Sequence, residues 1–534
     1  MKLTNARFAG ASITALAVAA ALGLGSMTAT AAENALRIAN MDEPDTLDPH
    51  NANGTWENRI LGDMFLGLTT EAANGSVIPG AAETWTVSED GTVYTFTIRD
   101  HSWSDGTPVT ADDFVFSLRR ILDPQTAAKY ASLLYPIKNA EAVNTGKSPL
   151  ENLAVRAVDD KTLEITLESP TPYFLAQLPH YTAWPVPKHA VEMHGANWVK
   201  KENIASNGAY MLDEYLPNTH VKLVKNPKFY DAANVSIDTL YFYPGEDRAQ
   251  ALKRFRAGEV DVSTDFASDQ IRWLKENLPD QTRIAPYLGI YYYVMNTEKE
   301  PFTDPRVRQA LSTVIDRETI VDKVMKTGEV AAYSFVPPGT GNYGEPSYVS
   351  WNGMSTDERV AKAQDLLAEA GYGPDNPLKF TLRYNTSENH KRIAIAVSSM
   401  WKELGVQAEL FNSEVKVHYN DLQEGDFQIA RAGWIADYDD PQNFLYLLET
   451  KAGPMNYGNF SNADFDSLME QAARTTDLDK RADLLAQAER VAMDAQANIP
   501  IYYYVSKNLV SDRVVGWQDN AKDIHRSRWL SLKD

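Results

Sequence analysis

The residues best suited to binding chemistry lie between positions 427 and 441, where an apolar run turns polar. The apolar start at 427–430 predicts a buried β-strand, and Arg431, Trp434 and Asp437 follow at the expected mouth of that strand. A site that captures both charged ends of a peptide needs a cation for the carboxylate and an anion for the ammonium. Arg431 and Asp437 are candidates for that pair. The alternative is a solvated ion pair at a strand end, which contributes little to stability.

The first 32 residues are expected to be a signal peptide. Lys2 and Arg7 form a basic start, residues 8–27 are apolar and uncharged, and Ala29-Thr30-Ala31 offers a cleavage site. A membrane anchor is the competing interpretation, but the run is short and rich in Ala and Gly, and no later segment reaches 18 consecutive apolar residues. We therefore expect an exported, periplasmic protein.

Composition narrows the class further. The chain has no cysteine, so neither a lipidated cysteine, a disulfide nor a zinc–sulfur site is expected. The nine histidines are scattered without metal-ligand spacing, and no cofactor or metal is predicted. The net charge is −21, and removing the two positive charges of Lys2 and Arg7 leaves −23. Nucleic acid and anionic membranes are therefore poor partners, and we expect a monomer.

Hydrophobic periodicity predicts mixed α/β structure. Strands are expected at 93–99, 162–167, 240–243 and 379–384, and helices at 111–122, 305–324, 357–370, 390–404 and 478–496. No short repeat, heptad pattern or low-complexity linker interrupts the chain. The length allows two to four domains, and the lack of linkers predicts that these share chain crossings.

Eight segments in sequence resemble the periplasmic oligopeptide-binding proteins of ABC importers, within bacterial extracellular solute-binding protein family 5. They are LDPH at 47–50, GAAETW at 80–85, WSDGTPVTADDF at 103–114, SNGAY at 206–210, the stretch 302–317, YNTSENHK at 384–391, the stretch 431–441, and IPIYYY at 499–504. Their order and spacing match from about residue 36 to the C-terminus.

The resemblance implies an α/β, two-lobed clamshell of the type II, cluster C periplasmic-binding class, with a third domain. Lobe I is expected to be discontinuous, at 33–65, 188–288 and 506–534, with a satellite domain at 66–187 and lobe II at 289–505. The chain would cross between lobes near 287–289 and 504–505, making a two-stranded hinge. Ligand would lie between the lobes and would be delivered to an inner-membrane permease and its ATPases.

The resemblance also implies the site. Asp437 is expected to bind the peptide ammonium, with Arg431 and His390 as candidate carboxylate partners, although a histidine at a helix start is also typical of a cap neighbour. The other expected ligand contacts are Asn53, Gly54, Thr55, Tyr130, Tyr287, Tyr292, Gly433, Trp434, Ile435, Ala436 and Tyr503, or Tyr504 in its place. At most half of the rings in the two tyrosine triplets at 291–293 and 502–504 should touch ligand.

Departures from the family pattern bear on the ligand. Two further cations of the best-known peptide binders correspond here to Met325 and Leu422, and a pocket tryptophan corresponds to Val415. An acidic residue near the ligand corresponds to Asn53, and a disulfide seen in some relatives would join Gly289 and Ile435. We therefore expect a narrow length range, with tripeptide-sized ligands, or a murein peptide as the close variant.

Two other functions compete. A secreted glycosidase would need two carboxylates, and Asp437, Asp439 and Asp440 are available. However, the positive charge of Arg431 nearby would lower the pKa of such a carboxylate and make it a poor general acid. The sequence also lacks G-x-S-x-G, H-E-x-x-H and P-loop motifs, so no enzyme is expected. The same clamshell could instead carry a dipeptide, glutathione or another ligand, and a retained Asp437 favours one with a free α-amino group.

Overall fold

The computed structural model describes residues 34–52 and 54–533. The leader expected over residues 1–32 and the candidate site residue Asn53 lie outside the described residues. Within the described ranges, no helix is both long enough and apolar enough to cross a membrane.

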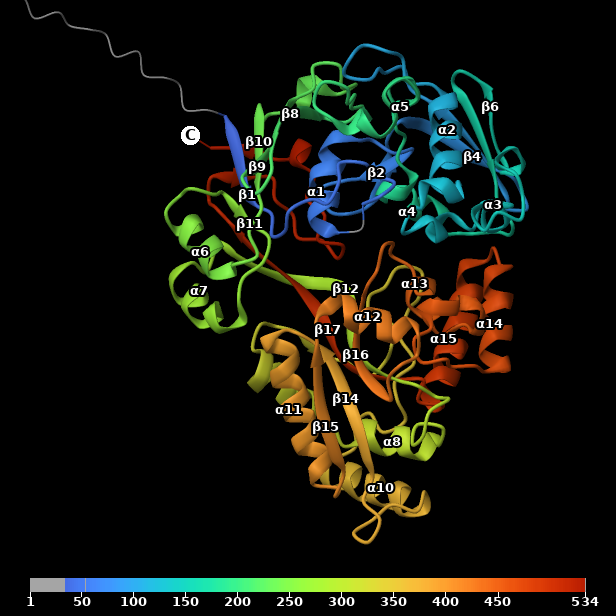
Figure 1. Cartoon of the computed structure of the whole chain (residues 1–534), viewed down its shortest axis with the longest axis vertical. Coiled ribbons are helices and arrows are strands. Elements are labelled where there is room, and N and C mark those ends of the chain that lie inside the picture. Colours follow the sequence, from blue (N-terminus) through green and yellow to red (C-terminus); the bar gives the residue numbers. More distant parts are fainter. Residues whose placement is uncertain (1–33, 53, 534) are drawn as a thin grey trace, which may run out of the picture. The chain divides into compact units, whose positions relative to one another are not determined.

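One sheet of eleven strands dominates the described part of the chain. Its path runs β15 (Gln407–Ser413), β14 (Lys379–Asn385), β16 (Ile429–Ile435), β12 (Thr282–Met295), β17 (Asn498–Val510), β11 (Val262–Ser263), β1 (Ala35–Ala39), β10 (Thr239–Tyr243), β9 (His220–Lys225) and β8 (Tyr210–Leu216), with β13 (Val330–Ala331) paired to β17. The long strands β12 and β17 lie antiparallel beside each other, and β16 pairs with the other edge of β12 (Figure 1). These two strands thus connect two groups of shorter strands within one sheet.

A second sheet has the order β4 (Ala82–Val87), β5 (Val93–Ile98), β7 (Thr162–Thr166) and β6 (Val155–Asp159). Two small ladders join β2 (Thr69–Glu71) to β3 (Val77–Pro79) and β18 (Val514–Val515) to β19 (Ser531–Leu532). The strands predicted at 93–99, 162–167, 240–243 and 379–384 are confirmed to within a residue or so.

Helices alternate with these strands along the chain. Their bounds are α1 (Thr55–Met64), α2 (Ala111–Leu122), α3 (Ala140–Asn144), α4 (Phe174–Gln177), α5 (Lys188–His194), α6 (Arg248–Arg256), α7 (Ile271–Asn277), α8 (Pro305–Thr313), α9 (Arg317–Thr319), α10 (Thr356–Glu369), α11 (Glu388–Lys402), α12 (Val415–Gln423), α13 (Gln442–Leu445), α14 (Ala463–Ala473) and α15 (Leu478–Asp494). Helix α2 begins with a capping box between Thr110 and Asp113, as its sequence predicts. Helix α11 packs along β14 and β15, and α14 packs along α15 (Figure 1).

The prediction of one helix over 305–324 is wrong. Helix α8 ends at Thr313, and a new start at Asp316 leads into α9 and a π-helical turn at Ile320–Met325. The cause is the buried Arg317, whose Nη1 donates to the carbonyls of Ser312 and Ile315 at 3.1 Å each. These carbonyls are satisfied by a side chain, so the helix can stop without leaving buried acceptors unpaired.

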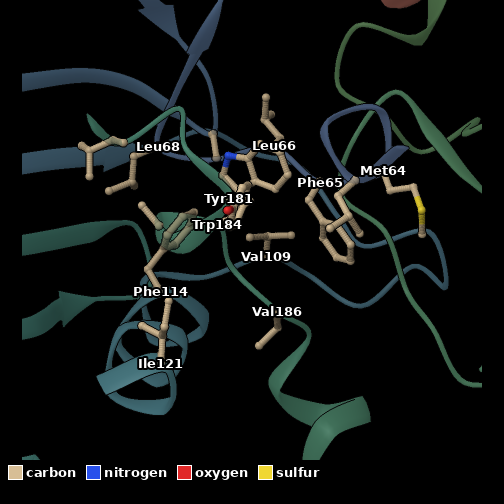
Figure 2. Close-up of a cluster of buried hydrophobic side chains, with 14 of the residues drawn as sticks. Met64, Phe65, Leu66, Leu68, Val109, Phe114, Ile121, Tyr181, Trp184 and Val186 are labelled. Carbon is tan, nitrogen blue, oxygen red and sulfur yellow. The ribbon is translucent and has the colours of Figure 1, made fainter. Parts of the chain in front are cut away.

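The largest hydrophobic core joins chain segments that are far apart in sequence. It contains residues of β1, α1, the four-stranded sheet, α2 and β8 to β10. Figure 2 shows part of it, with side chains around the end of α1, from α2 and from the segment 181–186, which includes Trp184. Separate clusters lie on the two faces of the β12–β16–β17 region.

Candidate ligand-binding site

Asp437 is a carboxylate held without a strong cationic partner. It lies two residues beyond the end of β16, and its side chain is 19% exposed. Its Oδ2 accepts a hydrogen bond from the Tyr130 hydroxyl at 2.5 Å, and His180 Nε2 lies 3.7 Å from Oδ1. Burial lowers the pKa of His180 to about 3, so this imidazole is neutral. In the described chain, no lysine or arginine comes within ion-pair distance of Asp437.

Burial raises the pKa of Asp437 to about 6, although the hydrogen bond from Tyr130 favours the charged form. At neutral pH the group is therefore an anion whose desolvation is only partly compensated. A buried anion of this kind is a suitable partner for a cationic group of a ligand.

Asp437 faces a cavity of about 140 Å³. Six predicted site residues line it: Gly54, Thr55, Tyr287, Ile435, Ala436 and Asp437. The loop at Gly54 is fixed because its backbone N–H donates to Glu57 Oε2 at 2.8 Å at the start of α1. The structure therefore brings the loop before α1 and the end of β16 to one place.

The cavity is also lined by charged residues that were not predicted from the sequence, which include Arg59, Glu71, Lys522, Asp523 and Arg526. Glu71 is fully buried between Lys522 Nζ at 3.5 Å and Arg526 Nε at 3.4 Å. The segment 522–526 lies between the last long strand and the C-terminus and carries no motif. Only the tertiary fold places it at the cavity.

Arg431 forms a second, separate centre. It is the third residue of β16, opposite Tyr293 of β12, and is only 8% exposed. Its position at the mouth of the strand was therefore wrongly predicted, because pairing with β12 continues to Ile435 and keeps Arg431 inside the sheet. Arg431 and Asp437 also form no ion pair with each other, since each has its own partners.

The partners of the Arg431 guanidinium are all neutral. Nη1 donates to Tyr419 Oη at 2.9 Å and Asn385 Oδ1 at 3.3 Å, and Nη2 donates to Tyr504 Oη at 2.8 Å. The guanidinium carbon lies 4.9 Å from the ring centre of Tyr291, a cation–π distance. Nε has no hydrogen-bond partner among the described residues. A buried cation without a carboxylate is suited to binding an anionic group.

His390 adds a neutral donor to this centre. It is the third residue of α11, and its ring centre lies 5.5 Å from that of Tyr291. Burial, and then the charge of Arg431, lower its pKa to about 2. Its Nδ1 is buried and without a hydrogen-bond partner. His390 can therefore offer an N–H to a carboxylate, but not a positive charge.

The remaining predicted residues divide between site and core. Trp434 is partly buried, and its Nε1 donates to Asn443 Oδ1 at 2.8 Å. A side chain at Gly433 would clash with the Arg431–Tyr504 bond, since its Cβ would lie 2.8 Å from both partners. Tyr292 packs edge-on against Phe335, and the Tyr503 hydroxyl donates to Ser334 O at 3.0 Å. These two rings make core contacts here, and their contact with ligand stays a prediction.

The positions taken from the family pattern fall in different environments. Gly289 and Ile435 are directly opposite each other on β12 and β16, as a bridging pair would require. Met325 lines a second cavity, of about 790 Å³, beside Lys323, Lys326 and Arg392. Leu422 is buried in a core cluster, whereas Val415 is 43% exposed.

The two acids after Asp437 have structural partners. Asp440 is fully buried in a two-pronged ion pair with Arg481, at 2.7 and 2.8 Å, and it also accepts from Gln442 N at 2.9 Å, before α13. Asp439 is exposed and accepts from Gly341 N at 2.7 Å. Both carboxylates are thus engaged by groups other than Asp437.

Strands β12 and β17 join the two groups of strands in the large sheet, and β16, which pairs with β12, carries Arg431 and leads to Asp437. The model of bacterial extracellular solute-binding proteins, family 5 (Middle), matches residues 76–456. The chain therefore belongs to this family.

Curated relatives and a solved structure agree with this family membership. The periplasmic oligopeptide-binding protein OppA of Escherichia coli is 40% identical, over 90% of this chain and 88% of OppA. The probable deoxycholate-binding periplasmic protein YgiS of E. coli is 38% identical, over 95% of each chain. The structure of the E. coli murein tripeptide-binding protein MppA matches with a TM-score of 0.84 and 39% identity, covering 94% of this chain and 99% of MppA. The fold is the multidomain clamshell of these binding proteins.

Proposed function

We propose that this protein is the periplasmic substrate-binding component of an ABC importer, and that it captures short peptides in extended form between two lobes. The observation that carries the proposal is the pair of isolated charges on one chain segment. Asp437 offers an anion to the peptide ammonium, and Arg431, with the His390 N–H, offers a cation to the peptide carboxylate.

The spacing of these charges suits a tripeptide. Arg431 and Asp437 are six positions apart, so their Cα atoms are at most about 20 Å apart at about 3.3 Å per residue. A tripeptide in extended form spans about 10 Å. The two side chains and a hydrogen bond at each end cover the remainder.

A free sheet edge supports the extended form. Strand β14 pairs with β16 only at Ile429 and Ala430, whereas β12 pairs with all seven residues of β16. In the described chain, no strand pairs with the other edge of β16 from Arg431 to Ile435. The Arg431 carbonyl already lies 2.8 Å from His418 Nε2, which leaves Ala432 to Ile435 for a ligand. A peptide strand there would have its backbone groups paired without selection of its side chains.

The hinge is proposed at 287–289 and 504–505, between a first lobe at 33–65, 188–288 and 506–534 and a second lobe at 289–505. Pairing of β12 with β17 is interrupted between Pro286 and Ile290, which supports bending at this point. The satellite domain, proposed at 66–187, supplies Tyr130, whose hydroxyl reaches Asp437 of the second lobe. A ligand that contacts both lobes favours closure by its differential affinity for the closed state.

The proposal extends to export and partners. Cleavage of residues 1–32 would release a monomer without a lipid anchor, because no cysteine is present to carry one. The loaded, closed form would dock transiently on a membrane permease driven by ATPases. Catalysis is not part of the proposal, because the family is one of solute-binding proteins and the acids beside Asp437 are engaged elsewhere.

A murein tripeptide is the close alternative, since the MppA structure is among the most similar. A second alternative is a ligand like deoxycholate, which the relative YgiS is named for binding. Such a ligand has a carboxylate for Arg431 but no ammonium for Asp437. The isolated Asp437 carboxylate therefore favours an amino-terminated ligand.

Native mass spectrometry of the protein purified from cells tests the proposal. Ligand released by denaturation should be a set of short peptides with free amino termini, and the stripped protein should bind tri-alanine in calorimetry. A ligand without an amino group, together with no binding of tri-alanine, would refute it.

A further inference from the structure

The cavity at Asp437 is larger than an ammonium group needs. Its volume of about 140 Å³ is well above the roughly 10–15 Å³ that one water molecule needs. From Asp437 it extends to Thr55, Asn58 and Arg59, which lie on one face of α1 because they are three and four residues apart. There is thus room for a side chain beside the ammonium position.

Arg59 is the under-used cation of this cavity. Its Nη2 is 3.9 Å from Asp523 Oδ2, at the limit of an ion pair, and its Nη1 is buried without a hydrogen-bond partner. Asp523 already accepts from Asn508 Nδ2 at 2.7 Å and contacts His525 Nε2 at 3.1 Å. A buried guanidinium N–H without an acceptor is costly, and an acceptor brought by a ligand would remove that cost.

The charges around the cavity point to the same kind of ligand group. Beside His180 and His525, the cavity is lined by three carboxylates, Asp437, Glu71 and Asp523, and by three lysine or arginine cations, Arg59, Lys522 and Arg526. The ammonium of a bound peptide adds one positive charge to this balanced set. A carboxylate on the first side chain would restore neutrality, whereas a lysine side chain would add a second excess positive charge.

We infer that this cavity is the subsite for the first side chain of the bound peptide, and that Arg59 selects a side chain ending in a hydrogen-bond acceptor, above all a carboxylate. The inference rests on the proposed function, because Asp437 must hold the ammonium for the first side chain to enter here. The preference is expected to decrease in the order Glu, Gln, Leu and Lys.

Competition calorimetry at pH 7.5 with Glu-Ala-Ala, Gln-Ala-Ala, Leu-Ala-Ala and Lys-Ala-Ala on ligand-stripped protein tests this order. The wild-type protein should bind the Glu peptide about tenfold more tightly than the Leu peptide, the scale of one charge-assisted hydrogen bond, and the Lys peptide most weakly. Equal affinities, or a preference for Leu or Lys, would overturn the subsite.

Variants assign the effect to Arg59. Arg59→Met should reduce the Glu-to-Leu ratio to about one, and Arg59→Lys should retain part of it. Arg248→Met is the matched control: Arg248 also forms an ion pair with an aspartate, Asp265, but does not line the cavity, so the ratio should be unchanged. An unchanged ratio in Arg59→Met would refute the role of Arg59. Failure of all four peptides to bind wild-type protein would instead refute the proposed function.

Discussion

Asp437→Asn should make the ligand-free protein more stable while nearly abolishing its binding. The asparagine keeps the shape of the side chain and an acceptor for the Tyr130 hydroxyl, but it removes the partly uncompensated charge. These opposite effects distinguish a ligand-binding carboxylate from a structural one, whose removal would lower stability.

The size of the stability effect follows from the pKa. Burial raises the pKa of Asp437 from 3.8 to about 6, so ionisation opposes folding. The penalty is absent below pH 3.8, grows as the pH rises to about 6, and is constant above that. At 1.36 kcal/mol for each pKa unit, it reaches about 3 kcal/mol at pH 7.5 and falls to about 1 kcal/mol at pH 4.5. With an unfolding entropy of about 1 kcal/mol/K for about 500 residues, Tm should rise by about 3 °C at pH 7.5 and about 1 °C at pH 4.5.

Affinity should change in the other direction. An ammonium buried without its anion costs about 3–5 kcal/mol, which corresponds to binding of tri-alanine weakened by a factor of about 2 × 10² to 5 × 10³. Differential scanning calorimetry of stripped protein measures the first effect, and isothermal titration calorimetry measures the second. Asp439→Asn is the control, because this nearby exposed acid bonds only to Gly341 N among the described residues. A lower Tm for Asp437→Asn at pH 7.5, or a Kd within about threefold of wild type, would refute the reasoning.

Three further predictions concern the same charges. Affinity for tri-alanine should fall about tenfold from pH 7.5 to pH 5, because Asp437 in the free protein gains a proton through about pH 6 and must release it to bind the ammonium. Calorimetry in buffers of different ionisation enthalpy should detect the released proton. An affinity that does not change with pH would contradict this role of Asp437. Arg431→Met should weaken the binding of tri-alanine about a hundredfold, but the binding of tri-alanine with an amidated C-terminus by less than about threefold. Equal losses of affinity in titrations of the two peptides would argue against carboxylate binding by Arg431. Arg481→Met leaves the buried Asp440 carboxylate without its cation and should lower the free energy of unfolding by about 3–5 kcal/mol, measured as a lower Tm. The double variant Arg481→Met/Asp440→Leu should recover most of the lost stability. An unchanged Tm in the single variant would contradict this prediction.

The local parts of the fold were predictable because their causes are local. Helix α2 has its capping box and an apolar stripe within twelve residues, and the predicted bounds are confirmed. The end of α8 was not predictable in this way. Arg317 stops it by donating to carbonyls of its own turn and also to Pro500 O, at 2.8 Å, from a strand far along the chain. No sequence window contains both partners.

The site residues likewise differ in whether local sequence or the tertiary fold determines their role. Asp437 could be selected because an acid after an apolar strand stands out, and the family resemblance gave it a role. The burial of Arg431 could not be foreseen, since it depends on the pairing of β16 with β12. Arg59, Lys522 and Asp523 meet at the cavity from positions more than 460 residues apart in the chain. Their charges look like ordinary surface charges until the fold brings them together.

The most direct measurement is a calorimetric titration of ligand-stripped protein at pH 7.5 with tri-alanine and with N-acetyl tri-alanine. If Asp437 binds the peptide ammonium, tri-alanine should bind with a Kd of about 1 μM, or about −8 kcal/mol, and the acetylated peptide at least about a hundredfold more weakly. Equal affinity for the two peptides, or no binding of either, would contradict the proposed function.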